Sequence, residues 1–254
     1  MTKTAVVTGA SSGIGAATVR QLAAAGFHVI AGARRMDRLT ELKSEIPSID
    51  VRSLDVTDEQ SVRDFVQNID SCDVLVNNAG AAYDLDQVAD ADPEKWRASF
   101  DVNVLGSLRV TKSLLPILLK TPQGKHTSHI VFMGSTAGRV AYEGGGSYTA
   151  AKHGLAAMVG TLRLELAGKP IRVTEIAPGM VKTDEFTLKR FEGNTERTDA
   201  LYADVDRPLT AEDIADCVVW SVTRPPHVNI DLMVVRPIAQ AAQHKTFRGP
   251  IGNN

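Results

Sequence analysis

Three side chains in the middle of the sequence could together move a proton: Ser135, Tyr148 and Lys152. The tyrosine and the lysine are four residues apart, so in a helix they share one face, about a turn from each other. The pKa of a phenol is ordinarily about 10, and a neighbouring ammonium lowers it by favouring the phenolate. We therefore expect Tyr148 to exchange a proton with a substrate oxygen that Ser135 also binds. Since this spacing is more often an ordinary half-exposed helical turn, the rest of the sequence must decide between the two interpretations.

The elements that would position these residues follow an alternating pattern. Short apolar runs rich in β-branched residues alternate with longer amphipathic stretches, as in βαβ units with a parallel sheet. The predicted strands are residues 4–8, 28–33, 51–54, 74–76, 129–133, 172–176 and 230–235. The predicted helices are residues 13–25, 37–45, 59–68, 93–119, 147–167 and 211–223. With no long linker or repeat, residues 1–254 are expected to form a single α/β domain with a doubly wound sheet.

Two segments break this rhythm. Residues 184–208 mix charged, polar and aromatic side chains without a clear period. An irregular segment of this length inside a domain is usually a functional lid or a disordered loop, and we expect a substrate lid. Residues 237–254 are also aperiodic, and this tail is expected to be irregular, either frayed or packed on a partner subunit.

The composition argues against several classes of function. The 254 residues are 43% hydrophobic and 23% charged, with a net charge of −2, and lack the basic surplus typical of nucleic-acid binding. The two cysteines, Cys72 and Cys217, form no metal-ligand pattern with histidines and predict no disulfide. No apolar stretch approaches the roughly 20 residues that span a bilayer. We expect a cytoplasmic protein that binds neither nucleic acid nor membrane and holds no metal.

A glycine-rich turn follows the first predicted strand and reads Thr8-Gly9-Ala10-Ser11-Ser12-Gly13-Ile14-Gly15. Glycine permits the tight turn and lets backbone amides approach a pyrophosphate closely. The positive end of the following helix also favours an anion. Such turns can simply connect strands to helices, but the βαβ context of this one predicts dinucleotide binding. A P-loop is disfavoured, because no lysine and hydroxyl pair follows the last glycine.

The end of the second predicted strand indicates which dinucleotide binds. Sites that prefer NAD usually carry an acidic residue there for the ribose 2′-hydroxyl, whereas this chain has Ala33 followed by Arg34 and Arg35. Guanidinium groups suit a 2′-phosphate through bidentate hydrogen bonds and charge. We therefore expect NADP, with Ser12 adding a hydroxyl to the phosphate; two arginines that merely end a surface loop are the alternative.

The motifs of this chain resemble those of the short-chain dehydrogenase/reductase family over essentially its whole length. They are Thr8-Gly9-x-x-x-Gly13-Ile14-Gly15, Asp55-Val56, Asn77-Asn78-Ala79-Gly80, Asn103, Ser135, Tyr148-x-x-x-Lys152 and Pro178-Gly179. The resemblance implies a Rossmann fold with a seven-stranded parallel sheet and an NADP-dependent enzyme that acts on CH-OH donors. It also implies a homo-oligomer, a dimer or homotetramer, with helices 93–119 and 147–167 at the contacts.

The same resemblance implies a role for each matching residue. Tyr148 is the expected general acid or base, Lys152 lowers its pKa and binds the nicotinamide ribose, and Ser135 polarises the substrate oxygen. Asn103, in a helix, is expected to hold a water that links Lys152 to solvent. The expected cofactor-binding residues, besides Tyr148 and Lys152, are Gly9, Ser11, Ser12, Gly13, Ile14, Gly15, Arg34, Arg35, Asp55, Val56, Asn77, Ala79, Gly80, Pro178, Gly179, Val181 and Thr183.

Within the family, the chain most resembles NADP-dependent dehydrogenases of 3-hydroxy acids and serine-like substrates. The resembling segments are residues 134–138, Arg190-Phe191 with Gly193, and residues 226–230. A small hydroxy acid needs a cation for its carboxylate, and we expect Ser135, Tyr148 and Arg190 to bind the substrate. The other candidate cations are Lys182, Lys189 and Arg139. All four could instead form the solvated face of a lid.

Two other functions stay open. The first is NADPH-dependent reduction of a carbonyl or aldehyde, a secondary metabolite or a xenobiotic. The second is a catalytically inactive NADP-binding regulatory protein. Such a protein is expected to lack at least one of Asn103, Ser135, Tyr148 and Lys152, and all four are present.

Overall fold

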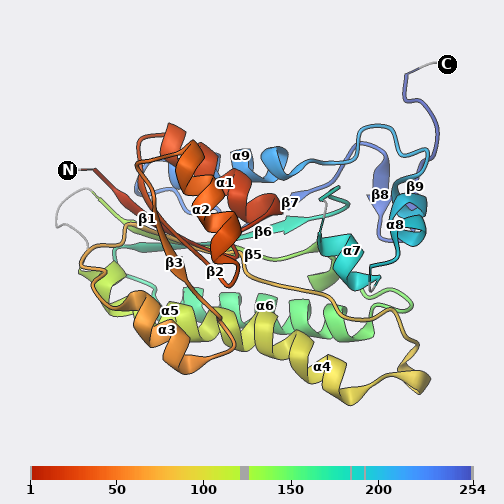
Figure 1. Cartoon of the computed structure of the whole chain (residues 1–254), viewed down its shortest axis with the longest axis horizontal. Helices are drawn as coiled ribbons and strands as arrows, with labels where there is room; N and C mark the ends of the chain where they lie inside the picture. The colour runs from red at the N-terminus through yellow and green to blue at the C-terminus, as the bar shows by residue number, and fades with distance from the viewer. Residues whose placement is uncertain (1, 121–125, 184, 192, 253–254) are drawn as a thin grey trace.

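Seven parallel strands form one sheet through the middle of the molecule (Figure 1). The computed structural model describes residues 2–120, 126–183, 185–191 and 193–252. The strands are β1 (Thr4–Thr8), β2 (His28–Ala33), β3 (Asp50–Ser53), β4 (Val74–Asn77), β5 (Ser128–Met133), β6 (Ile171–Pro178) and β7 (Leu232–Val235). All seven were expected from the sequence, with ends that differ by no more than a few residues.

The strand order reverses beside β1. The sheet reads β3-β2-β1-β4-β5-β6-β7, so the chain first builds outwards from β1 and then returns to β4 on its other side. This doubly wound order confirms the predicted Rossmann fold. Because ligands bind in such sheets at the carboxyl ends of the strands near the reversal, the site is expected where β1, β4, β5 and β6 end.

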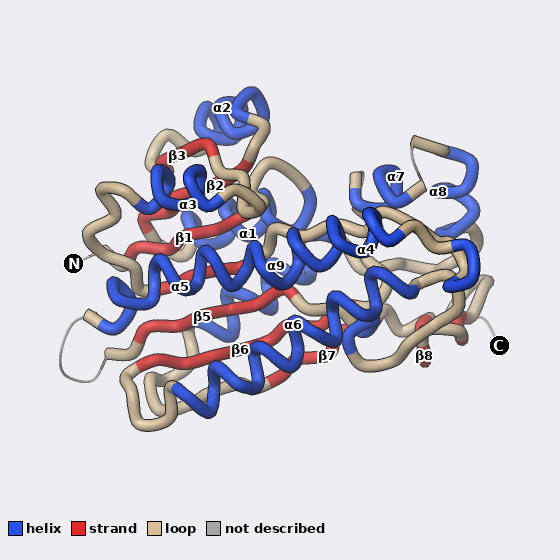
Figure 2. The backbone as a smooth tube through the Cα atoms, turned by 90° about the horizontal axis from the view of Figure 1, so that it is seen from below, coloured by secondary structure: helices blue, strands red, loops and turns tan. Residues whose placement is uncertain are grey.

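Helices cover both faces of the sheet (Figure 1). One face carries α1 (Gly13–Ala24), α2 (Met36–Glu45) and α9 (Ala211–Val222). The other face carries α3 (Glu59–Val66), α4 (Pro93–Phe100), α5 (Gly106–Leu119) and α6 (Gly146–Glu165). Figure 2 shows α5 and α6 running over this second face.

The sequence of the strands explains why both faces need cover. Every residue of β1 is buried, and the side chains of β4 alternate between two cores. Leu75 packs with the α3, α5 and α6 side, while Val74 and Val76 pack with the α1 and α9 side. A strand with apolar side chains on both faces can be stable only between two layers of helices.

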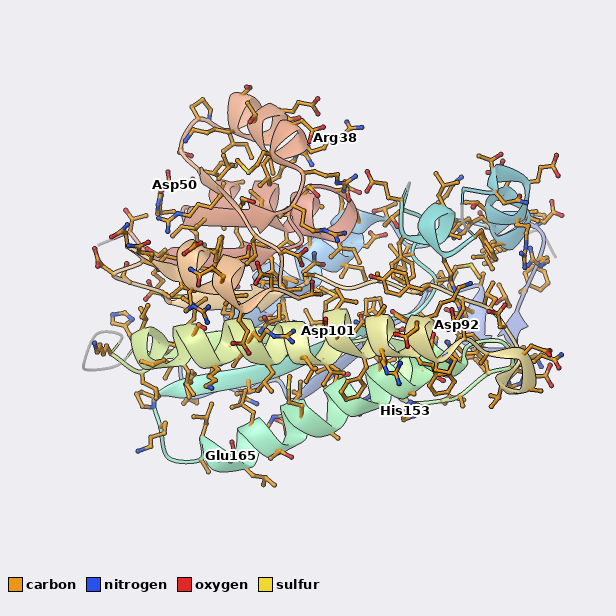
Figure 3. The ribbon with its side chains drawn as sticks, turned by 60° about the horizontal axis from the view of Figure 1, so that its bottom comes forward. Arg38, Asp50, Asp92, Asp101, His153 and Glu165 are labelled. Atoms are coloured by element: carbon orange, nitrogen blue, oxygen red, sulfur yellow. The ribbon has the colours of Figure 1, made fainter. Side chains whose placement is uncertain are left out.

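Local capping sets where several helices begin. Asp92 (Figure 3) accepts a hydrogen bond from the backbone of Glu94, and Pro93 occupies the first helical position of α4. Thr210 and Asp213 form a reciprocal capping box at the start of α9. These caps satisfy backbone N–H groups that have no partner within the helix.

The predicted helix 93–119 contains a wider turn. Residues Asp101–Leu105 form a π-helical turn between α4 and α5. By length and mean hydropathy the span Pro93–Leu119 could cross a membrane, contrary to the expectation from the sequence, but 44% of its most apolar window is buried inside the protein. Val110 and Leu114 are fully buried in the core beneath the sheet, as in a core helix.

Both segments that looked aperiodic contain short regular elements. The expected lid includes α7 (Phe186–Arg190) and α8 (Thr195–Tyr202), and Asn194 caps α8. The tail, expected to be irregular, contains an antiparallel pair, β8 (Gln240–Ala242) and β9 (Lys245–Thr246). Elements of two to eight residues are too short to show a hydrophobic period, which is why the pattern missed them.

Candidate active site

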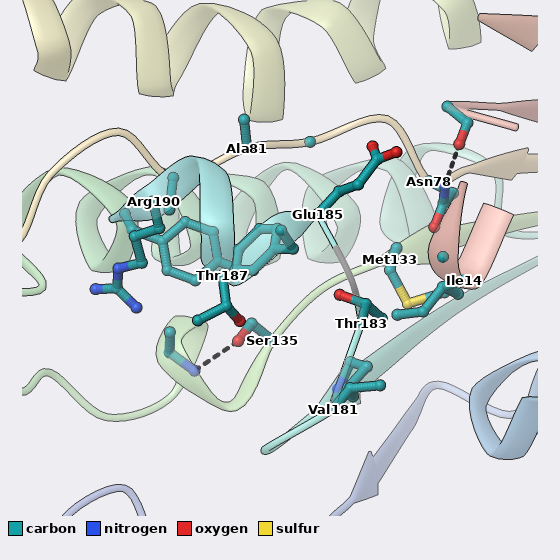
Figure 4. A pocket seen from close by; sticks show the side chains of 18 of the residues that line it. Ile14, Asn78, Ala81, Met133, Ser135, Val181, Thr183, Glu185, Thr187 and Arg190 are labelled. Atoms are coloured by element: carbon teal, nitrogen blue, oxygen red, sulfur yellow. Dashed lines mark hydrogen bonds between the residues drawn. The ribbon is translucent and has the colours of Figure 1, made fainter. Parts of the chain in front are cut away.

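A long cavity of about 780 Å³ lies along the carboxyl edge of the sheet. Its lining comes from the glycine-rich turn after β1, the ends of β2, β4, β5 and β6, the start of α6, and α7. Figure 4 shows part of this lining, with Ile14 and Asn78 towards one end and Arg190 at the other. The cavity therefore coincides with the edge that the strand order singles out.

Ser135, Tyr148 and Lys152 all line this cavity. Ser135 follows β5 and begins a short 3-10 turn, where its Oγ accepts a hydrogen bond from the backbone of Ala137. Tyr148 and Lys152 lie on α6, and the Ser135 hydroxyl is near enough to the phenol of Tyr148 to lower its pKa. The turn and the helix pack closely, since a Cβ on Gly138 would lie 2.7 Å from the carbonyl oxygen of Lys152. The spatial convergence expected from the sequence is therefore present.

The phenol of Tyr148 is held in its protonated form. Its pKa is raised to about 12, mainly by burial, while the hydrogen bond from Ser135 and the positive charge of Arg190 partly oppose the rise. The sequence argument expected the pKa to fall towards neutrality because of Lys152. That direction is wrong for this structure, because the loss of water around the phenol outweighs the nearby charges.

The ammonium of Lys152 is also buried. Its Nζ donates a hydrogen bond of 2.8 Å to the carbonyl oxygen of Met133 at the end of β5 and lies 5.7 Å from the centre of the Tyr148 ring. Burial lowers the pKa of Lys152 to about 8, and the carboxylate of Glu175 partly opposes this. Glu175 is buried on β6 and forms an ion pair with Arg139. Arg139 does not line the cavity, so its role as a cation for substrate is wrong.

Asn103 lies in the π-helical turn rather than in a regular helix. Its amide Nδ2 donates to the carbonyl oxygens of Ala81 and Ser99, both at 2.8 Å, and its Oδ1 is buried without a hydrogen-bond partner in the described part of the chain. A Cβ on Gly80 would lie 2.7 Å from that oxygen and 3.5 Å from Lys152 Nζ. Only a glycine at position 80 leaves both polar atoms facing the same small space, which suits the bridging water expected from the sequence.

Stability should depend on pH through Lys152. Its pKa is about 8 in the folded chain and ordinarily 10.5, so between these values only the unfolded chain holds the proton and stability rises with pH. Lys152→Met removes this dependence. The stability of the variant relative to the wild type should fall by about 2 kcal/mol from pH 7 to pH 10.

Denaturant unfolding of both proteins at the two pH values measures this difference. Lys169→Met is the matched control, because Lys169 is exposed and its replacement should give the same difference at both pH values. A constant difference for Lys152→Met as well would show that the ammonium is hydrated rather than buried.

The glycine-rich turn is packed against the segment after β4. Gly9 has φ of +65°, and a Cβ there would lie 2.8 Å from Ala79 Cα. Thr8 Oγ1 accepts hydrogen bonds from the backbone of Asn78 and Ala79, and Asn78 Nδ2 donates to the carbonyl of Thr8. These contacts hold the turn between β1 and β4, where the strand order reverses, and α1 begins at the end of the turn.

Most of the expected cofactor residues line the cavity, and two do not. The lining includes Gly9, Ser11, Ser12, Gly13, Ile14, Arg34, Arg35, Asp55, Val56, Ala79, Gly80, Tyr148, Lys152, Pro178, Gly179, Val181 and Thr183. Gly15 instead packs on the turn, where a Cβ would lie 2.2 Å from the carbonyl oxygen of Gly9. Asn77 is buried and donates to Thr111 Oγ1, whereas its neighbour Asn78 lines the cavity. Asn77 and Gly15 are therefore corrected to supporting positions.

The two arginines after β2 have different partners. Arg34 lies 4.0 Å from the carboxylate of Asp55. Arg35 donates from Nη2 to the hydroxyls of Ser11 and Ser12, at 2.9 Å each, and binds the carboxylate of Glu185 at 2.6 to 2.7 Å. One guanidinium group and two serine hydroxyls thus gather at the amino end of α1, a donor set that suits a phosphate.

The other end of the cavity is aromatic and carries Arg190. Its Nη2 donates to Tyr142 Oη at 2.8 Å, and its guanidinium lies 5.8 Å from the centre of the Tyr148 ring. Phe186 meets the Tyr148 ring edge-on, with centroids 5.6 Å apart. Lys182 does not line the cavity, and the side chain of Lys189 lies outside the described residues. Of the three candidate cations whose side chains the structure describes, Arg190 is the one in the lining.

A family model described as short chain dehydrogenase matches residues 3–192. The chain belongs to this family. An uncharacterised oxidoreductase of Mycobacterium tuberculosis is 51% identical over 249 residues, which cover 98% of this chain and 96% of that protein. Sulfoacetaldehyde reductase 2 of Chromohalobacter salexigens is 39% identical, covering 95% of this chain and 96% of that protein. The closed form of serine dehydrogenase complexed with NADP+ has a TM-score of 0.89 and 34% identity, covering 97% of this chain and 100% of that one.

Some lining residues of this short-chain dehydrogenase had no signal in the sequence. Glu185 lies in a segment without a period, and Gln243 comes from the tail, where its side chain accepts a hydrogen bond from Thr136. Gln240 accepts from the backbone of Met180 just after β6. Their positions depend on how the segment after β6 and the C-terminal tail pack against the cavity, and no local pattern encodes that. Among the described residues no cluster of His, Cys, Asp and Glu could hold a metal ion.

Proposed function

We propose that this short-chain dehydrogenase interconverts a small hydroxy compound of the 3-hydroxy acid type and its carbonyl form, with NADP(H). The observation that carries the proposal is the convergence of Ser135, Tyr148 and Lys152 in one cavity whose far end gathers Arg35 and two serine hydroxyls. The first three groups suit proton exchange with an oxygen atom, and the second set suits the phosphate that distinguishes NADP from NAD.

The residues present fit the cofactor. Gly9 lets the turn pack closely on Ala79, Gly13 leaves the backbone at the start of α1 open, and the amino end of α1 lies behind the turn. Asp55 and Val56 would contact the adenine, Arg35 and Ser12 the 2′-phosphate, and Lys152 the nicotinamide ribose. When bound, the nicotinamide supplies or accepts the hydride. The serine dehydrogenase relative described with NADP+ has the same fold over 97% of this chain, which supports this cofactor.

The protein's own groups then handle the oxygen and its proton. Ser135 Oγ and Tyr148 Oη would both bind the substrate oxygen, where negative charge grows during reduction. Because the pKa of Tyr148 is raised to about 12, the phenol is protonated at neutral pH and can donate its proton to that oxygen. Lys152 and Asn103 Oδ1 flank Gly80 and would lead the replacement proton in from solvent. In oxidation the same groups would act in reverse.

The substrate class follows from Arg190 and the aromatic rings around it. The guanidinium group of Arg190 lies beside Tyr142 and Tyr148. It could bind a small anionic group, such as a carboxylate, on the same substrate molecule that carries the reacting oxygen. The names of the relatives point the same way. Serine carries a carboxylate, and sulfoacetaldehyde carries a sulfonate, each a short distance from its hydroxyl or carbonyl carbon. Arg190 is proposed to hold that anion.

Tyr148→Phe should lose turnover while keeping cofactor affinity. The ring and its packing on Phe186 remain, but the proton is gone, so kcat should fall by about 10² to 10⁴. Steady-state oxidation of NADPH with a short anionic aldehyde measures kcat, and quenching of NADPH fluorescence measures cofactor binding. Turnover within a few-fold of the wild type would remove Tyr148 from the proton transfer.

Arg190→Ala should discriminate against anionic substrates. The loss of a charge-assisted contact should lower kcat/KM by about 10- to 100-fold for serine and sulfoacetaldehyde. A neutral aldehyde of similar size should lose less than threefold. Lys182→Ala removes a nearby cation whose side chain does not line the cavity, so it is the control and should change neither.

The same substrate panel separates the proposed function from its alternative. Equal losses with charged and neutral substrates in Arg190→Ala would contradict the acid-binding role. They would favour a general carbonyl or aldehyde reductase with a bulkier apolar substrate.

We also propose a homotetramer located in the cytoplasm. Leu108 on α5 and Leu164 on α6 are 44% and 79% exposed, which supports subunit contacts along these helices. Light scattering of the purified chain checks the assembly, where a mass four times the 27.3 kDa of one chain is expected. A monomer at micromolar concentration would contradict it.

A further inference from the structure

A carboxylate of this chain lies where the proposed function places the phosphate of the cofactor. Glu185 Oε1 accepts from Arg35 Nη1 at 2.7 Å, and Oε2 lies 2.6 Å from Arg35 Nη2 and 2.9 Å from Ser12 Oγ. The two oxygens thus bind the guanidinium in the bidentate geometry that a phosphate would use. Arg35 Nη2 also donates to Ser11 Oγ at 2.9 Å.

The contact shifts the pKa values of both Glu185 and Arg35. The hydrogen bond with Arg35 lowers the pKa of Glu185 below its ordinary value, and the contact with Glu185 raises the pKa of Arg35. Both groups are therefore charged at neutral pH. The carboxylate and a phosphate dianion cannot occupy one guanidinium fork together, because they need the same donors and repel each other.

Glu185 is connected to the substrate end of the cavity by the shortest helix of the lid segment. It immediately precedes α7 (Phe186–Arg190), which carries Phe186 against Tyr148 and Arg190 against Tyr142. Figure 4 shows Glu185 and Arg190 pointing away from each other, towards opposite ends of the cavity. One short helix is thereby fixed at both ends by arginine contacts across the cavity.

We propose that Glu185 is an internal competitor of the 2′-phosphate, so that NADP binds by displacing it and thereby releases the amino end of α7. This inference rests on the proposed use of NADP. A cofactor without the phosphate leaves the contact between Glu185 and Arg35 in place. Glu185 therefore lowers the affinity for NADP and makes the position of α7 depend on which cofactor is bound.

Binding of two small nucleotides tests the competition without turnover. Adenosine 2′,5′-bisphosphate carries the phosphate in question, adenosine 5′-monophosphate lacks it, and calorimetry gives both affinities. Glu185→Gln should bind the bisphosphate about fivefold more tightly than the wild type, since an exposed ion pair of this kind has been removed. The affinity for the monophosphate should stay unchanged. In the Arg35→Ala background, Glu185→Gln should have no effect, and Glu196→Gln on α8 is the matched control.

The outcomes separate this inference from the proposed cofactor. Suppose that the wild type prefers the bisphosphate and that Arg35→Ala removes this preference. If Glu185→Gln then binds the bisphosphate with the same affinity as the wild type, the proposed use of NADP stands and the competition is wrong. If the wild type shows no preference at all, the proposed use of NADP fails and the competition fails with it. A loss of monophosphate affinity in Glu185→Gln would make Glu185 an acceptor for the ribose 2′-hydroxyl and would also overturn the inference.

Hydrogen exchange of α7 gives a second readout. In the wild type the bisphosphate should speed amide exchange in residues 186–190, and the monophosphate should not. In Glu185→Gln exchange should already be fast with neither nucleotide bound. Unchanged or slower exchange in the wild type when the bisphosphate is bound would contradict the release of α7.

Discussion

The burial of one phenol and one ammonium in the same small space is the constraint on which the rest of the site depends. Away from water, Tyr148 keeps its proton and Lys152 holds its charge only weakly, so both groups have pKa values shifted by burial. Residues at and just after the end of strand β5 supply polar partners that offset the cost of this burial. The carbonyl oxygen of Met133 at the end of β5 accepts a hydrogen bond from the ammonium of Lys152. The hydroxyl of Ser135, two residues later, lies near the phenol of Tyr148. A less complete set of partners would leave buried polar groups unsatisfied.

The same constraint accounts for irregular features around the site. The π-helical turn places Asn103 with its amide fixed by two carbonyls and its oxygen towards Gly80, and wide turns of this kind occur often at functional sites. Gly138 allows α6 to approach the turn after β5 within van der Waals distance. On β6, Glu175 contributes a negative charge that raises the pKa of Lys152 and is itself balanced by Arg139. Three sets of contacts thus support Tyr148 and Lys152, the pair proposed to transfer protons.

Much of this could be predicted from the sequence. The strands, the main helices, the glycine-rich turn and the shared helix face of Tyr148 and Lys152 follow from local periods and fixed spacings. The resemblance to the family implied that Ser135 would join them. The pairing of Arg139 with Glu175 and of Arg35 with Glu185 could not be predicted, because the partners are 36 and 150 residues apart. The direction of the Tyr148 pKa shift also depends on burial, which no spacing reveals. The sequence thus indicated which groups are present, and the fold decides which charges they meet.

A crystal structure of the protein with NADPH and the best hydroxy acid from the substrate panel tests the central claim most directly, since this pair cannot react and should stay bound. The account predicts that the hydroxyl oxygen lies about 3 Å from both Ser135 Oγ and Tyr148 Oη, beside the nicotinamide ring, with the acid group on Arg190. A hydroxyl bound away from Tyr148, or a nicotinamide ring at the far end of the cavity, would contradict the proposed chemistry.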